Sequence, residues 1–90
     1  MHEEALFRDL RQKLEEVALR ANVRRIRRIV LRIGALSHVT ERTLRSRWDS
    51  VMAGTPAEGA WLTIETLTDP NDPRATSIEL VSVDVGSDGP

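Results

Sequence analysis

Residues 1–3, Met1-His2-Glu3, contain the groups best suited to hold a metal ion. A free α-amine on Met1, the next backbone nitrogen and the His2 imidazole can close adjacent chelate rings around one ion. Such a planar, nitrogen-rich set suits Ni(II) or Cu(II) better than it suits zinc, which prefers tetrahedral sites. The bulk of His2 should protect Met1 from removal by bacterial processing. The alternative is that His2 is an ordinary exposed residue at a chain end.

A helix must position these residues, because an amphipathic pattern begins directly after them. The spacing predicts a helix over residues 4–21 that ends at Asn22, with one apolar stripe. The stripe consists of Leu6, Leu10, Leu14, Val17, Ala18 and Ala21, broadened by Phe7.

Residues 26–34 then alternate between apolar and polar side chains, which predicts a strand. Ile29, Leu31 and Ile33 share the face expected to contact a core. The arginines at and before its start could neutralise phosphates. However, no aromatic residues alternate with them to stack bases, and the net charge of the chain is −1, so we expect no nucleic-acid partner.

The second half predicts one more helix and two more strands. Thr40 is placed to cap the helix, which Gly54-Thr55-Pro56 should end. In a strand over residues 61–67, Leu62 and Ile64 should face the helices. Trp61 would then lie on the open face beside Val30. A loop over residues 69–76 leads to a strand over 77–85, where the apolar residues change phase between Leu80 and Val81 and favour a β-bulge.

The predicted order is therefore α-β-α-β-β, an α+β fold with two helices on one face of a three-stranded mixed sheet. We expect the last two strands to form a hairpin. We also expect one domain over residues 1–85 and a disordered tail over residues 86–90.

The charges are unevenly distributed between the two halves of the chain. Residues 1–48 hold 12 Arg or Lys and 6 Asp or Glu, a net +6, whereas residues 49–90 hold 1 and 8, a net −7. This division favours basic early elements lying against acidic late ones, and a basic face for an acidic partner is the alternative.

The composition excludes several classes of protein. Without cysteine there is no disulfide scaffold, thiolate zinc site or cysteine nucleophile. No apolar run is long enough to span a membrane, and charges occupy the N-terminus where a signal peptide needs apolar residues. We therefore expect a cytoplasmic protein with no membrane partner. The sequence has no phosphate-cradling glycine loop and no nucleophile beside a base, so we expect no enzyme.

Several short motifs together resemble the HypA/HybF family of hydrogenase-maturation nickel metallochaperones. The likeness runs from residue 1 to about residue 67 and rests on the order and spacing of its pieces. These are Met1-His2-Glu3, Ile33-Gly34-x-Leu36-Ser37, Gly54-Thr55-x-x-Glu58-Gly59-Ala60 and Leu62-x-Ile64.

The resemblance implies a Ni(II) carrier that serves the large subunit of nickel–iron hydrogenase together with the GTPase HypB. It implies nickel ligands at Met1 and His2, with a backbone contribution at Glu3, whose side chain would orient the site or the partner. Monomer and homodimer both remain open. The main alternative is a HypA-like interaction or regulatory subunit that no longer carries nickel.

The chain departs from the family pattern in two places. Family members carry a zinc module with two Cys-x-x-Cys pairs between the last two strands, and here the loop over residues 69–76 stands in that position, so no zinc is expected. An acidic residue of some relatives falls on Thr40. His38 lies in the short connection predicted over residues 35–39, at the strand end where an antiparallel first helix should begin. We therefore hypothesise that His38 supplies an axial or fourth ligand in place of that acid.

Overall fold

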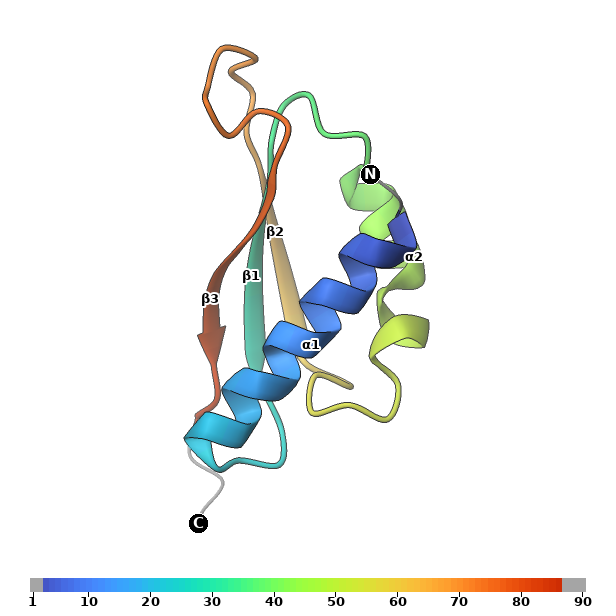
Figure 1. The fold of residues 1–90 in the computed structure, drawn as a ribbon, viewed down its shortest axis with the longest axis vertical. Helices are drawn as coiled ribbons and strands as arrows, with labels where there is room; N and C mark the ends of the chain where they lie inside the picture. The colour runs from blue at the N-terminus through green and yellow to red at the C-terminus, as the bar shows by residue number, and fades with distance from the viewer. Residues whose placement is uncertain (1–2, 87–90) are drawn as a thin grey trace.

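The computed structural model describes residues 3–86, and residues 87–90 of the expected tail lie outside this range. The element order α-β-α-β-β agrees with the sequence prediction (Figure 1). Its elements are α1 (Glu3–Ala21), β1 (Arg28–Ile33), α2 (Glu41–Met52), β2 (Trp61–Thr66) and β3 (Ile78–Asp84). No helix within the described residues is long and apolar enough to cross a membrane.

The sheet is mixed, and β1 is its central strand. The strand order is β2-β1-β3, with β1 parallel to β2 and antiparallel to β3. The predicted hairpin between the last two strands is therefore wrong. β1 is the most deeply buried strand, and its backbone groups need partners along both edges. The loop after β2 crosses the end of β1 and lets β3 pair with the far edge.

Both helices cover the same face of the sheet, where the core lies (Figure 1). The face of β1 predicted to be apolar is fully buried, with Ile29 and Leu31 both at 0% exposure. The apolar stripe of α1 is rotated slightly from its predicted position, because Phe7 is buried and Ala21 is exposed. The buried helix residues are Phe7, Leu10, Leu14 and Ala18 of α1 and Leu44, Trp48 and Met52 of α2. This mostly aliphatic core fixes how the two helices sit on β1.

The opposite face of the sheet is open and carries Trp61, which is 72% exposed. Leu62 and Ile64 pack against the core as predicted. The strand register pairs Trp61 with Arg28, so the prediction that Trp61 lies beside Val30 is wrong. Val30 lies two residues further along β1, on the same face of the sheet. The predicted bulge in β3 is present. The pairing of β3 with β1 shifts by one residue between Val30 and Leu31, so Val81 has no partner on β1. The apolar residues before and after this bulge can therefore both face the core.

The early basic strand lies between the two late acidic strands. Arg32 is opposite Glu65 of β2 and Glu79 of β3, and Arg28 is opposite Asp84. Of these, Arg32 and Glu65 form an ion pair, with Nη2 and Oε1 3.2 Å apart. The structure thus favours the intramolecular explanation of the charge division along β1.

Candidate metal site

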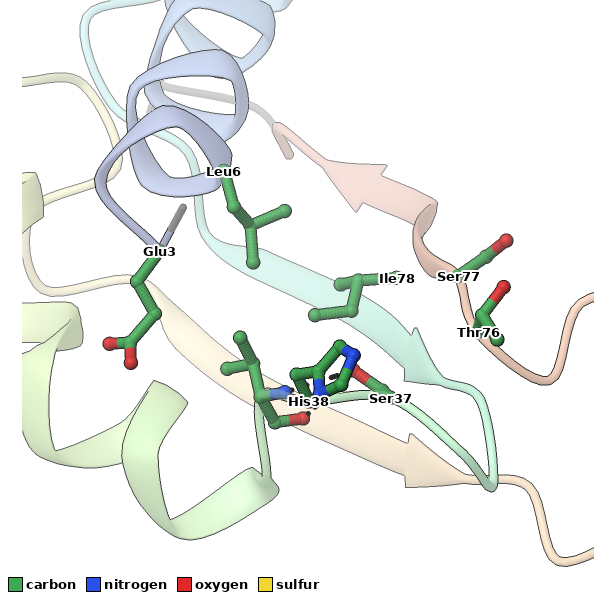
Figure 2. Close-up of a pocket in the computed structure, with 8 residues that line it drawn as sticks. Glu3, Leu6, Ser37, His38, Thr76, Ser77 and Ile78 are labelled. Atoms are coloured by element: carbon green, nitrogen blue, oxygen red, sulfur yellow. Dashed lines mark hydrogen bonds between the residues drawn. The ribbon is translucent and has the colours of Figure 1, made fainter. Parts of the chain in front are cut away.

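A hollow of about 310 Å³ lies where the start of α1, the β1–α2 connection and the start of β3 meet. Figure 2 shows its lining, with Leu6 and Ile78 pointing into the space beside the His38 ring. The residues that line it are Glu3, Leu6, Ser37, His38, Val39, Thr76, Ser77 and Ile78. Most of this lining is apolar, so its few polar groups decide what it can bind.

The connection that carries His38 is held by its backbone. The Leu36 amide donates to the Ala75 carbonyl at 2.7 Å, and the Ser37 amide donates to Gly34 at 3.1 Å. The Ser37 hydroxyl both donates to the Val39 carbonyl and accepts from the Val39 amide, at 3.0 and 3.2 Å. His38 lies inside this turn, and its side chain is exposed at the hollow. The main chain around it is fixed, whereas its ring has no hydrogen bond to any residue in the range 3–86.

Gly34 allows this connection to pass against the loop before β3. Its amide donates to the Ser77 carbonyl at 2.8 Å. A Cβ atom at this position would overlap the backbone of Arg74 and Ala75. Gly34 has no positive φ, so its requirement is close approach and not an unusual backbone conformation.

Glu3 lies at the mouth of the hollow, but its side chain is directed elsewhere. The carboxylate points toward α2 and away from His38 (Figure 2), and its Oε1 is 3.1 Å from Nη1 of Arg47. Arg47 in turn lies over the Phe7 ring, 4.8 Å from its centroid. This chain of contacts anchors the first turn of α1 to α2. Glu3 is therefore held at the mouth of the hollow by its contact with α2.

Of the four predicted site residues, Glu3 and His38 belong to the part of the chain that the structure describes. Glu3 and His38, far apart in the sequence, line the same hollow. Met1 and His2 lie outside the described residues. Within residues 3–86, no group of three or more His, Asp or Glu side chains is arranged to hold a metal ion. The described part can offer one imidazole, so a complete nitrogen-rich site needs the two residues before Glu3.

Sequence reasoning missed the hydroxyl residues of the hollow, Ser37, Thr76 and Ser77. Ser37 could have been found, because it precedes His38 in a connection predicted to be short. Thr76 and Ser77 could not, because their place depends on β3 pairing with β1, and the predicted hairpin put that strand elsewhere.

The loop after β2 contains its own ion pair. Arg74 donates to both carboxylate oxygens of Asp72 through its side chain, each at 3.0 Å, and its amide donates to Oδ1 at 2.7 Å. These hydrogen bonds lower the pKa of Asp72 from 3.8 to about 2, and the carboxylate raises the pKa of Arg74. The pair closes a turn next to Ala75 and Thr76, beside the hollow.

Another motif of the family resemblance, Gly54-Thr55-x-x-Glu58-Gly59, forms the turn between α2 and β2 at the other end of the sheet. The Gly54 amide donates to the Glu58 carboxylate at 2.6 Å, and Gly54 and Gly59 both have positive φ. The buried Thr55 hydroxyl donates to the Met52 carbonyl at 2.8 Å and accepts from the Ala57 amide at 3.1 Å. These hydrogen bonds stabilise the turn that ends α2, and none of these residues lines the hollow.

Comparison with known proteins gives a consistent result. The family model described as "Hydrogenase/urease nickel incorporation, metallochaperone, hypA" matches residues 1–70. The hydrogenase maturation factor HypA of Azorhizobium caulinodans is 42% identical over 64 residues, which cover 71% of this chain and 57% of that protein. Those of Methylocella silvestris and Acidithiobacillus ferrooxidans are each 40% identical, over 72% and 74% of this chain and 58% and 59% of theirs. The chain thus matches well under two thirds of the length of these relatives.

Proposed function

Because the chain belongs to the HypA family of hydrogenase/urease nickel-incorporation metallochaperones, we propose that it is a nickel-binding accessory protein that delivers Ni(II) during maturation of nickel–iron hydrogenase. Met1 and His2 supply the amine, amide and imidazole nitrogens, and Glu3 contributes at its backbone. The recipient is the hydrogenase large subunit, and a HypB-like GTPase assists the transfer. The chain carries and exchanges a metal and catalyses no reaction.

One observation supports this proposal most directly. Glu3, the last residue of the Met1-His2-Glu3 motif, lines the same hollow as His38, the other histidine of the sequence. Two imidazoles and a terminal amine would form a nitrogen-rich set of the kind that Ni(II) and Cu(II) favour. The Glu3 carboxylate is paired with Arg47, so the ion would be held mainly by nitrogen.

Transfer by ligand exchange needs ligands that a partner can reach, and His38 is exposed at the open hollow. A partner could then replace the ligands of the ion one at a time. Because imidazole and amide nitrogens bind metal only without their protons, nickel affinity should fall as the pH is lowered. Copper should bind at least as tightly as nickel, so selectivity would come from the partner and from metal availability.

Isothermal titration of Ni(II) tests the proposal with a pair of matched proteins. One is the untagged chain, and the other carries two extra residues before Met1, which block the α-amine and displace His2. We expect the extension to lower affinity by more than the roughly 10- to 100-fold that loss of an outer-shell partner costs. The same two residues placed after Pro90 serve as the control and should leave binding unchanged. Equal binding by all three proteins, or binding by none, would refute nickel carriage through this terminus.

A further inference from the structure

The outer edge of β2 presents backbone groups that pair with no strand within residues 3–86. The Trp61 amide donates to the carbonyl of Arg27, just before β1, and the Leu67 amide donates to that of Ile33 at the end of β1, both at 2.8 Å. By the two-residue alternation of a strand, odd-numbered residues of β2 bond to β1 and even-numbered ones direct their N–H and C=O groups outward. Leu62, Ile64 and Thr66 therefore form a free edge. Figure 1 shows β2 at one margin of the sheet.

The two edges of the sheet differ in how they resist pairing with another strand. β3 has the bulge at Val81 and places Glu79 and Asp84 along its length, both of which are features that protect edges. β2 has no bulge, no proline and no lysine. Its one charged residue, Glu65, is already paired with Arg32. An exposed Trp61 next to an unprotected edge is the pattern expected of a strand that pairs with another chain.

We propose that β2 pairs with β2 of a second copy of this chain, antiparallel and with the two-fold axis at Ile64. The pairing joins two three-stranded sheets into one of six strands. In this register, Ile64 exchanges hydrogen bonds with its own copy, and Leu62 does so with Thr66 of the other chain. All three outward-facing residues are satisfied at once.

Side-chain chemistry selects this register over its neighbours. With the axis at Ile64, Trp61 lies across from Leu67 and Thr63 across from Glu65, so the exposed indole gains an apolar partner. An axis at Glu65 would place two carboxylates opposite each other, which destabilises a strand pair. An axis at Thr63 would place Trp61 across from Glu65. The sequence of β2 is therefore most complementary to itself in the first arrangement.

One existing contact at this edge is compatible with the pairing. Nη1 of Arg45, on α2, donates to the Leu62 carbonyl at 3.2 Å. A carbonyl oxygen can accept a second hydrogen bond, so Thr66 of the other copy can donate to it as well. The strand is short, and six residues per chain bury less than the roughly 1,600 Å² of a standard interface. The dimer should therefore dissociate on dilution.

Disulfide trapping tests the register, because the chain has no cysteine of its own. We expect T63C protein mixed with E65C protein to cross-link under mild oxidation at least about ten times more than either variant alone, since non-hydrogen-bonded antiparallel pairs bring Cα atoms to about 4.5 Å. Ser82 lies exposed on the open face of β3, so T63C mixed with S82C is the matched control. Cross-linking of T63C alone, of E65C alone or of the control to the same extent would overturn the register.

Sedimentation equilibrium over a range of concentrations tests the dimer itself. The two exposed hydrophobic residues on the edge strands provide matched variants, Trp61→Glu on β2 and Val81→Glu on β3. We expect Trp61→Glu to raise the dimer dissociation constant at least about tenfold, as for a buried aromatic anchor. Val81→Glu should leave it within about twofold. A monomer at every concentration, or equal effects of the two variants, would refute pairing through β2.

Discussion

The two ends of β1 are both tied to later segments of the chain, but their side chains are used differently. At the turn end, where α2 leads to β2, the Pro56 carbonyl accepts from the Ile26 amide, and the Thr55 hydroxyl and the Glu58 carboxylate bond to the backbone. At the pocket end, which borders the hollow, the amides of Gly34 and Leu36 donate to carbonyls of the loop before β3. There the His38 ring is left exposed at the hollow.

This difference separates motifs that build the fold from groups that are available to a ligand. The Gly54-Thr55-x-x-Glu58-Gly59 motif has a complete structural explanation, so a likeness there supports the family and the fold. His38 has no such structural role among residues 3–86, and it lies where α1 begins. We therefore expect ligand binding at the pocket end and a purely structural role for the turn end. Four measurements can test this difference.

The largest expected effect comes from Gly34→Ala at the pocket end. The added methyl group would overlap the backbone of Ala75, so we expect a loss of about 3 kcal/mol in the free energy of unfolding. Gly59→Ala at the turn end is the matched substitution, because nothing lies within 4 Å and only its φ of +77° opposes a side chain. It should cost about 1–2 kcal/mol. Urea unfolding followed by tryptophan fluorescence measures both, and a smaller loss for Gly34→Ala would show that this end is not closely packed.

Next in size is Thr55→Val at the turn end. The substitution leaves the buried Ala57 amide without its acceptor, and we expect it to lower the free energy of unfolding by about 2 kcal/mol. Nickel affinity of the folded protein should not change. Urea unfolding and nickel titration of the same preparation give the two quantities. A fall in affinity with unchanged stability would contradict a purely structural role for this turn.

The opposite pattern is expected for His38→Ala. Its stability should stay within about 0.5 kcal/mol of the parent, because the side chain is exposed and makes no described hydrogen bond. We expect nickel affinity to fall about tenfold, the lower range for loss of a supporting group around a metal. Leu36→Ala, at another exposed residue of the same connection, is the control. If His38→Ala left both the affinity and the nickel absorption spectrum unchanged, His38 would be removed from the site.

The smallest effect is expected at Asp72, in the loop beside the pocket end. Its pKa is lowered in the folded protein, so the ion pair with Arg74 contributes fully above pH 3.8 and is lost as the pH falls toward 2. An NMR titration of the Asp72 carboxyl carbon should give a midpoint near 2. In Arg74→Ala the midpoint should move back toward 3.8. A midpoint that stays near 2 without Arg74 would assign the shift to another group.

Local patterns predicted every helix and strand. The apolar spacing from Leu6 to Ala18, the cap at Thr40 and the phase change at Val81 each act over a few residues, so their consequences can be derived from the sequence. The pairing of β3 could not be derived in this way. It depends on which edge of β1 remains unpaired after β2 has docked, and this is a property of the assembled sheet.

By itself, the sequence determined the elements and the buried face of β1, because each depends on neighbours within one or two turns of chain. Only the tertiary structure decided that Glu3 turns its carboxylate to Arg47, that Thr76 and Ser77 join His38 at one hollow, and that β2 is left at an edge. These outcomes require segments distant in the sequence to compete for the same partners. The partners are determined only when the helices and β3 pack against the central strand.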